Sequence, residues 1–204
     1  NGFASAGQQL VLQNTDGPQI LRAGRVSDGF FETLGVAPML GESVRVAAAG
    51  RTDAGVHAAG QVVSFAIQRD VSADRLLSAL NALTPRDISI RAAEVVADDF
   101  DPRRAARGRC YVYRIWNTRW PSPFWRRYAW HVAHPLDVER MRTAAAYLVG
   151  EHDFTSFQAA GCDADNPVRR VLRSEIETAG PLLTYSIEAT AFLRHMVRNI
   201  VGTL

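Results

Sequence analysis

Two glycines and three ionisable side chains crowd into residues 50–58, between two runs of β-forming residues. The stretch is Gly-Arg-Thr-Asp-Ala-Gly-Val-His-Ala, and the flanking runs are residues 43–48 and 61–67. Glycine tolerates the backbone angles of a sharp bend, and an aspartate such as Asp53 commonly stabilises a turn by bonding its own backbone. The sequence therefore predicts a strand–loop–strand unit whose bend carries an arginine, an aspartate and a histidine.

Further along, the chain alternates between helical and extended patterns. Apolar residues at helical spacing follow Ser72, a good N-cap, and Pro135 is a favourable first helical position. The expected helices are residues 72–83, 135–150 and 192–204, and the expected strands are residues 88–96, 110–117, 168–177 and 182–189. Short, hairpin-like connections between such elements predict an α+β fold, a largely antiparallel sheet with helices on one face.

Composition is that of an ordinary globular protein, with 47% hydrophobic and 22% charged residues in 204. No apolar run approaches the roughly 18–20 residues that span a bilayer, and no charged-then-apolar signal segment opens the chain. Cys110 and Cys162 fit neither a metal-binding nor a disulfide-framework spacing. We therefore expect a reduced, cytoplasmic setting without membrane contact.

Positive charge is concentrated in one part of the chain, although the net charge is only +2. All 23 basic residues are arginine, whose guanidinium binds phosphate with two donors and stacks on bases. Residues 101–142 hold only three acids, Asp101, Asp137 and Glu139, against ten arginines: Arg103, Arg104, Arg107, Arg109, Arg114, Arg119, Arg126, Arg127, Arg140 and Arg142. A local basic stripe of this kind is typical of proteins that bind nucleic acid.

Four blocks of the sequence, in order, resemble the TruA family of tRNA pseudouridine synthases. They are residues 50–58, 109–117, 150–157 and 192–204. The resemblance implies the pseudouridine synthase fold, in which two halves meet over a cleft. It also implies a cofactor-free isomerase that converts uridine to pseudouridine in the anticodon arm of tRNA, and a homodimer in which each tRNA contacts both subunits.

The same resemblance implies three catalytic residues. Asp53 matches the catalytic aspartate, Tyr111 the tyrosine that packs on the target base, and Arg198 the partner that keeps the carboxylate ionised. Whether the carboxylate attacks C1′, attacks C6 or assists loss of a ribose proton stays open. From the residues alone, Asp53 could be a turn former, Tyr111 a core tyrosine and Arg198 part of a solvated helix face.

Reaching a stacked uridine requires base flipping, so the RNA must also be held firmly. His57 and His195 lack further ligands at metal-binding spacing, so contact with phosphate is expected rather than a metal site. The Trp-rich residues 116–130 can stack nucleotides or serve as core or dimer-interface residues. The expected RNA-binding residues are Arg51, His57, Arg103, Arg104, Arg107, Arg109, Arg126, Arg127 and His195.

The first part of the chain does not follow the family pattern. Residues 1–41 resemble a periplasmic core segment of MacB-like permeases, through the run Phe-x-x-Leu-Gly-Val-x-Pro-x-x-Gly at residues 31–41. We expect an atypical, foreign segment at 1–41, an incomplete catalytic half at 42–104 carrying the Asp53 loop, and a truncated second half at 105–204. The alternatives are a divergent leader, an RNA-binding fragment without turnover, or a chimeric product.

Overall fold

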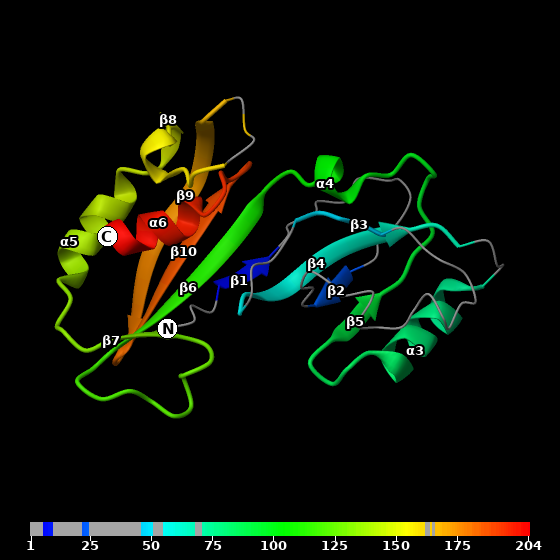
Figure 1. The fold of residues 1–204 in the computed structure, drawn as a ribbon, viewed down its shortest axis with the longest axis horizontal. Coiled ribbons are helices and arrows are strands. Elements are labelled where there is room, and N and C mark those ends of the chain that lie inside the picture. Colours follow the sequence, from blue (N-terminus) through cyan, green and yellow to red (C-terminus); the bar gives the residue numbers. More distant parts are fainter. Residues whose placement is uncertain are drawn as a thin grey trace. The chain divides into compact units, whose positions relative to one another are not determined.

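A computed structural model gives the fold and describes residues 46–50, 55–67, 71–161, 164 and 166–204, with the backbone of two further strands, β1 (Ala6–Gln9) and β2 (Arg22–Gly24). The chain divides into two compact units (Figure 1). One is Gln8–Arg107, the N-terminal unit, and the other joins Asn1–Gly7 to Gly108–Leu204, the C-terminal unit. Each unit has strands and helices of its own.

The sheet of the N-terminal unit is centred on β4 (His57–Phe65). This strand pairs antiparallel with β3 (Val46–Ala48) on one side and with β2 on the other. β2 in turn pairs antiparallel with β5 (Ser89–Ala92). Strands were predicted on both sides of the residue 50–58 loop, and both are present. The strand predicted at residues 88–96 is shorter than expected: only its residues 89–92 form β5.

One helix, α3 (Ala73–Leu83), packs against this sheet. Leu76 and Leu80 are buried in a cluster with Val63 of β4 and Ile90 of β5, as their helical spacing predicted. Ser72 holds the N-cap position, but its side chain makes no capping hydrogen bond. A different side chain bonds the helix to β5, and nothing in the sequence pattern indicated that role.

That side chain is Asn81, which bonds β5 from the far turn of α3. Its Nδ2 donates to the Ile90 carbonyl at 2.8 Å, and its Oδ1 accepts from the Ile90 N–H at 2.9 Å. One amide thus satisfies both backbone groups of a strand residue, which fixes the register of helix and strand.

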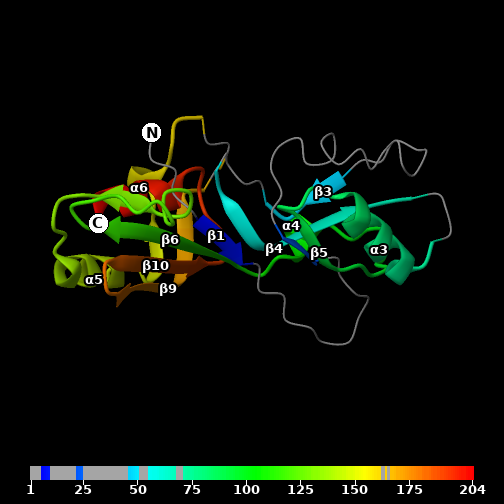
Figure 2. The ribbon, with the colours of Figure 1, turned by 90° about the horizontal axis from the view of Figure 1, so that it is seen from below.

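Four antiparallel strands form the sheet of the C-terminal unit: β8 (Gly150–Asp153), β9 (Val168–Ala179), β10 (Leu182–Ala189) and β6 (Arg109–Asn117), in that order. The three long strands lie side by side in both views (Figures 1 and 2). A short fifth strand, β7 (Trp130–Val132), pairs parallel with β6.

One face of this sheet is covered. Along β10, burial alternates strictly, with Leu183, Tyr185, Ile187 and Ala189 nearly inaccessible. Their partners on β6 are Ile115, Tyr113, Tyr111 and Arg109 respectively. Tyr111, Tyr113 and Ile115 therefore share the covered face, because alternate residues of a strand point to the same side of the sheet.

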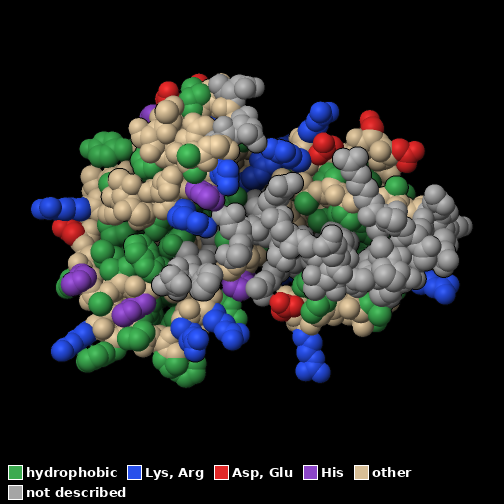
Figure 3. Space-filling view, viewed as in Figure 1, with side chains coloured by type: hydrophobic (Ala, Val, Ile, Leu, Met, Phe, Trp, Pro, Cys, Tyr) green, Lys and Arg blue, Asp and Glu red, His purple; other side chains and the backbone are tan. Residues whose placement is uncertain are grey.

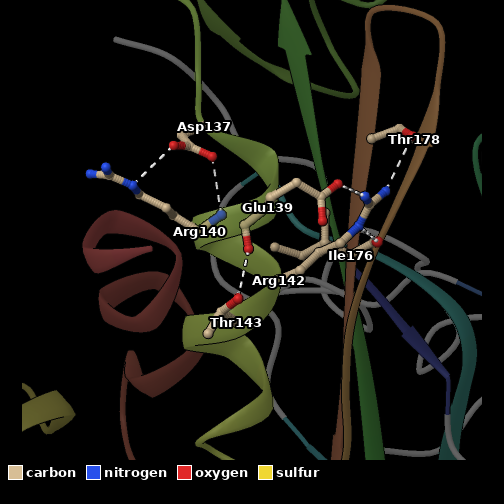
Figure 4. A network of polar contacts seen from close by, with 7 residues as sticks. All are labelled: Asp137, Glu139, Arg140, Arg142, Thr143, Ile176 and Thr178. Carbon is tan, nitrogen blue, oxygen red and sulfur yellow. Dashed lines mark hydrogen bonds and ion pairs between the residues drawn. The ribbon is translucent and has the colours of Figure 1, made fainter.

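Arg142 of helix α5 (Val138–Ala146) forms hydrogen bonds to β9 (Figure 4). Arg142 Nε donates to the Ile176 carbonyl at 3.0 Å, and its Nη2 donates to Thr178 Oγ1 at 3.3 Å. Its Nη1 also bonds Glu139 on the preceding turn. This member of the basic stripe therefore serves helix docking.

The starts of two helices differ from the sequence prediction, each for a local reason. The helix expected from residue 135 starts at Val138, because the Asp137 carboxylate accepts from the Arg140 N–H and caps it there. The helix expected from residue 192, α6, spans only Met196–Thr203, because His195 adopts the left-handed conformation (φ 57°). The first of these helices also ends at Ala146 rather than at Gly150, and Gly150 instead begins β8.

Candidate active site and RNA interface

Both ends of the residue 50–58 loop are fixed by the strands that flank it. Gln61 of β4, only 1% exposed, donates from Nε2 to the Gly50 carbonyl at 2.6 Å. The Ala49 N–H donates to the Val62 carbonyl at 3.0 Å. At the other end, Gly55 takes φ 81°, a left-handed value that favours glycine. The loop therefore begins and ends at defined points of β3 and β4.

Two predicted site residues in this loop, Arg51 and Asp53, lie outside the described residues. His57 is described and begins β4, so it belongs to the strand rather than to the bend. The role of Asp53 and the predicted cleft between two halves both stay predictions. Gln61 was not anticipated as part of the site. Its signal was a single polar residue at the head of the apolar run 62–63.

Tyr111 lies on β6, half-buried on the covered face of the C-terminal sheet. The edge of its ring meets Phe192, with centroids 4.9 Å apart and planes at 85°. Edge-to-face packing of this kind stabilises one ring orientation. Phe192 thus supports a tyrosine that the sequence singled out alone.

Arg198 lies on the exposed side of α6. Burial raises the pKa of Tyr113, and the positive charge of Arg198 opposes that rise. The guanidinium therefore lies within electrostatic reach of Tyr113, two residues from Tyr111 on the same face of β6. Tyr113 itself is a core residue, only 9% exposed.

The segment before α6 is tied to residues 157–161. The Ala159 N–H donates to the Arg194 carbonyl at 3.1 Å, and Arg194 Nη1 donates to the Gly161 carbonyl at 3.1 Å. From α6 itself, Asn199 Nδ2 donates to the Phe157 carbonyl at 2.9 Å. These three bonds orient the start of the helix that carries Arg198.

His195 stands where this segment turns into α6, in a conformation that costs an L-residue roughly 1–2 kcal/mol. Backbone strain of this kind is concentrated at functional sites.

Asp153, at the end of β8, stabilises the loop that follows it. Hydrogen bonds from the Thr155 hydroxyl (2.6 Å) and N–H (2.8 Å) hold the pKa of its carboxyl below the ordinary value.

The predicted phosphate-binding arginines are distributed over both units. In the N-terminal unit, Arg103 and Arg104 project from the short helix α4 (Pro102–Ala105), which Asp101 caps through their N–H groups, and Arg107 follows. All three side chains are exposed.

In the C-terminal unit, Arg109 is partly exposed, and its Nη1 lies 3.4 Å from the Thr190 carbonyl. Arg126 and Arg127 are exposed in the turns before β7. Within the described ranges, His, Cys, Asp and Glu form no group of three that could hold a metal ion. None of the helices described is long and apolar enough to cross a membrane.

Comparison with known proteins defines the class. A family model described as tRNA pseudouridine synthase matches residues 9–103 and 144–204. The tRNA pseudouridine synthase A of Myxococcus xanthus is 50% identical over 171 residues, covering 83% of this chain and 64% of its own. Those of Moorella thermoacetica and Bordetella petrii are 47% and 44% identical, covering 81% and 79% of this chain and 68% and 60% of their own.

The α+β fold and the family match together place the chain among pseudouridine synthases. The chain belongs to the TruA family of tRNA pseudouridine synthases. It spans about two thirds of the length of these relatives.

The family match begins at residue 9 and so takes in most of the segment predicted to be foreign. The resemblance of residues 1–41 to a permease segment is not borne out. The run behind that resemblance is short and contains two glycines and a proline, which occur in turns of many folds. The division at residues 42 and 105 stays a prediction.

Proposed function

We propose that this protein isomerises uridine to pseudouridine in tRNA, at the anticodon arm, without a cofactor. The observation that carries the proposal is the family match, whose two stretches include the positions of Asp53 and Arg198. The described ends of the Asp53 loop support it, since Gln61 and the β3–β4 pair secure that loop on a sheet.

The reaction is a rearrangement within one nucleotide. The bond between uracil N1 and ribose C1′ breaks, the base turns, and a bond forms between C5 and C1′. N1 gains a proton and C5 loses one, so no oxidant or reductant is needed. A carboxylate suits this reaction, because Asp53 can attack carbon covalently or stabilise positive charge that develops on the sugar.

Two residues of the C-terminal unit assist in this proposal. Arg198 keeps the Asp53 carboxylate ionised, since a nearby guanidinium lowers a carboxyl pKa. Tyr111 packs on the uracil, and its phenol can relay the proton that leaves C5. The edge contact from Phe192 supports this role, because it holds the Tyr111 ring in one orientation.

RNA is held by charge, and the flipped uridine is released from its stack to reach Asp53. Arg51, His57 and His195 contact the RNA near the site, and the arginines on both units bind phosphates, so affinity falls steeply with salt. We further propose that the protein acts in the cytoplasm as a homodimer in which each tRNA contacts both subunits.

Release of tritium from tRNA labelled at uridine C5 tests the proposal. Wild-type protein should release tritium, and Asp53→Asn should release none above background while still binding tRNA. Asp74→Asn, the same substitution on the exposed first turn of α3, is the matched control and should retain full release.

Release that survives Asp53→Asn would refute the assignment of the aspartate. Salt-dependent tRNA binding without release by the wild-type chain would favour an RNA-binding protein without turnover.

A further inference from the structure

Three large aromatic side chains project from the turns between β6 and β7. Trp120 is 69% exposed, Phe124 86% and Tyr128 45%. Burial of one such side chain stabilises a fold by about 1.5–3 kcal/mol, so leaving three of them exposed within nine residues gives up a substantial part of that stabilisation. Clustered exposed aromatics mark interaction sites. We call residues 116–131, from which they project, the aromatic turn.

The aromatic turn is held in shape by bonds to its own backbone. Trp116 Nε1 donates to the Trp120 carbonyl at 3.2 Å, and Thr118 Oγ1 donates to the same oxygen at 2.6 Å. His131 Nε2 donates to the Thr118 carbonyl at 2.8 Å, and the rings of Trp116 and Trp125 are stacked. A ligand therefore meets a surface whose ordering entropy is already lost, which favours binding.

The charge on the aromatic turn has one sign. The Arg119 guanidinium lies 4.8 Å from the centroid of the Trp120 ring, and Arg126 and Arg127 are exposed beside Phe124 in the chain. Residues 102–136 contain no aspartate or glutamate. In Figure 3, hydrophobic and arginine side chains lie together at the lower end of the C-terminal unit, where this turn lies in Figure 1.

Exposed rings interleaved with arginines fit a polyanion that offers flat apolar faces, which is unpaired nucleic acid. Bases stack on aromatic rings while arginines bind the phosphates between them. A paired helix hides its base faces, so stacking selects unpaired nucleotides. Pairing of the aromatic turn with itself in a second copy would bring six arginines together without an acid between them, which is unfavourable.

We propose that the aromatic turn binds unpaired RNA nucleotides by stacking them on Trp120, Phe124 and Tyr128, with Arg119, Arg126 and Arg127 at the phosphates. These residues fall between the two stretches that the family model matches. The inference rests on the proposed function for RNA as the partner. It extends that function by adding stacking contacts to the charge contacts, and its test distinguishes failure of the inference from failure of the proposed function.

The assay is fluorescence anisotropy with a fluorescein-labelled oligouridylate, and with a fully paired RNA duplex of equal length. Trp120→Ala and Phe124→Ala should each weaken oligouridylate binding roughly fivefold to a hundredfold, since one stacked base contributes about 1–3 kcal/mol. Duplex binding should change much less. Trp120 contributes only its carbonyl to the bonds that hold the turn, so the alanine variant keeps them.

Tyr147→Ala is the matched control, because Tyr147 is an equally exposed aromatic (77%) just beyond α5. It should leave oligouridylate binding within twofold. Equal losses for Tyr147→Ala and Trp120→Ala, or no loss for Trp120→Ala, would overturn the inference. So would a lower sedimentation mass of Trp120→Ala with RNA affinity unchanged, since that result assigns the surface to a second copy.

Tritium release distinguishes this inference from the proposed function. If the wild-type chain binds oligouridylate through Trp120 but releases no tritium, the proposed function fails and the stacking surface stands. If it releases tritium and Trp120→Ala leaves KM for tRNA unchanged, the stacking surface fails alone. With both correct, Trp120→Ala raises KM more than it lowers kcat, while Asp53→Asn abolishes release and keeps oligouridylate affinity.

Discussion

Replacing Gln61 by leucine tests whether the buried amide supports the loop that carries Asp53. Leucine has a similar size, so packing of β4 changes little. The substitution removes the 2.6 Å bond to the Gly50 carbonyl and the 3.2 Å bond that the Val62 N–H donates to Gln61 Oε1. At 1% exposure water cannot replace the amide, and a buried group left without its partner costs about 1–3 kcal/mol. We expect Gln61→Leu to lose about 2–4 kcal/mol of unfolding free energy.

Urea unfolding followed by circular dichroism measures this loss, and tritium release measures its effect on the loop. Ser78→Ala is the control, because it removes a hydrogen bond of 2.9 Å to the Asp74 carbonyl on the exposed surface of α3 in the same unit. The control should lose less than about 0.5 kcal/mol. Equal losses for Gln61→Leu and Ser78→Ala would show that the Gly50 bond does not stabilise the loop. Unchanged tritium release by a destabilised Gln61→Leu variant would show that the loop functions without the Gln61–Gly50 hydrogen bond.

Two further predictions concern the C-terminal unit. Burial raises the pKa of Tyr185 from its ordinary 10.0 to about 12, so stability is complete below pH 10 and falls by up to about 2.7 kcal/mol as the pH rises through 12; urea titrations of Tyr185→Phe should lack this alkaline loss, and an identical pH dependence would contradict the assignment. His195→Gly and His195→Ala both remove the imidazole, but only glycine accepts φ 57° without strain. The glycine variant should therefore be more stable than the alanine variant by about 1 kcal/mol in thermal unfolding, and the opposite order would refute the strain.

The long elements of the C-terminal sheet could be predicted because their pattern is local. Burial on one face imposes a period of two, and both β6 and β10 show that period in the sequence. The ends of helices were less predictable. Asp137 and His195 set the starts of α5 and α6 through a cap and a left-handed residue, and neither interrupts the apolar pattern of its helix.

The candidate site divides in the same way. Asp53, Tyr111 and Arg198 were chosen from motifs, which are contiguous in the chain. The residues that support them could not be chosen in this way, because each contacts a residue that is distant in the sequence. Phe192 reaches Tyr111 from a different element, and Gln61 holds Gly50 from the next strand.

By itself, the sequence determined the family, the α+β class and the strand–loop–strand unit at residues 50–58, since these depend on residue types and on the periods of helix and strand. Only the tertiary structure decided which polar groups are buried and which rings are not. It placed Gln61 inside and used Arg142 to dock a helix, while it left Trp120 and Phe124 in solvent. The physical reason is that burial and pairing depend on neighbours distant in the chain, and no local pattern of residues encodes them.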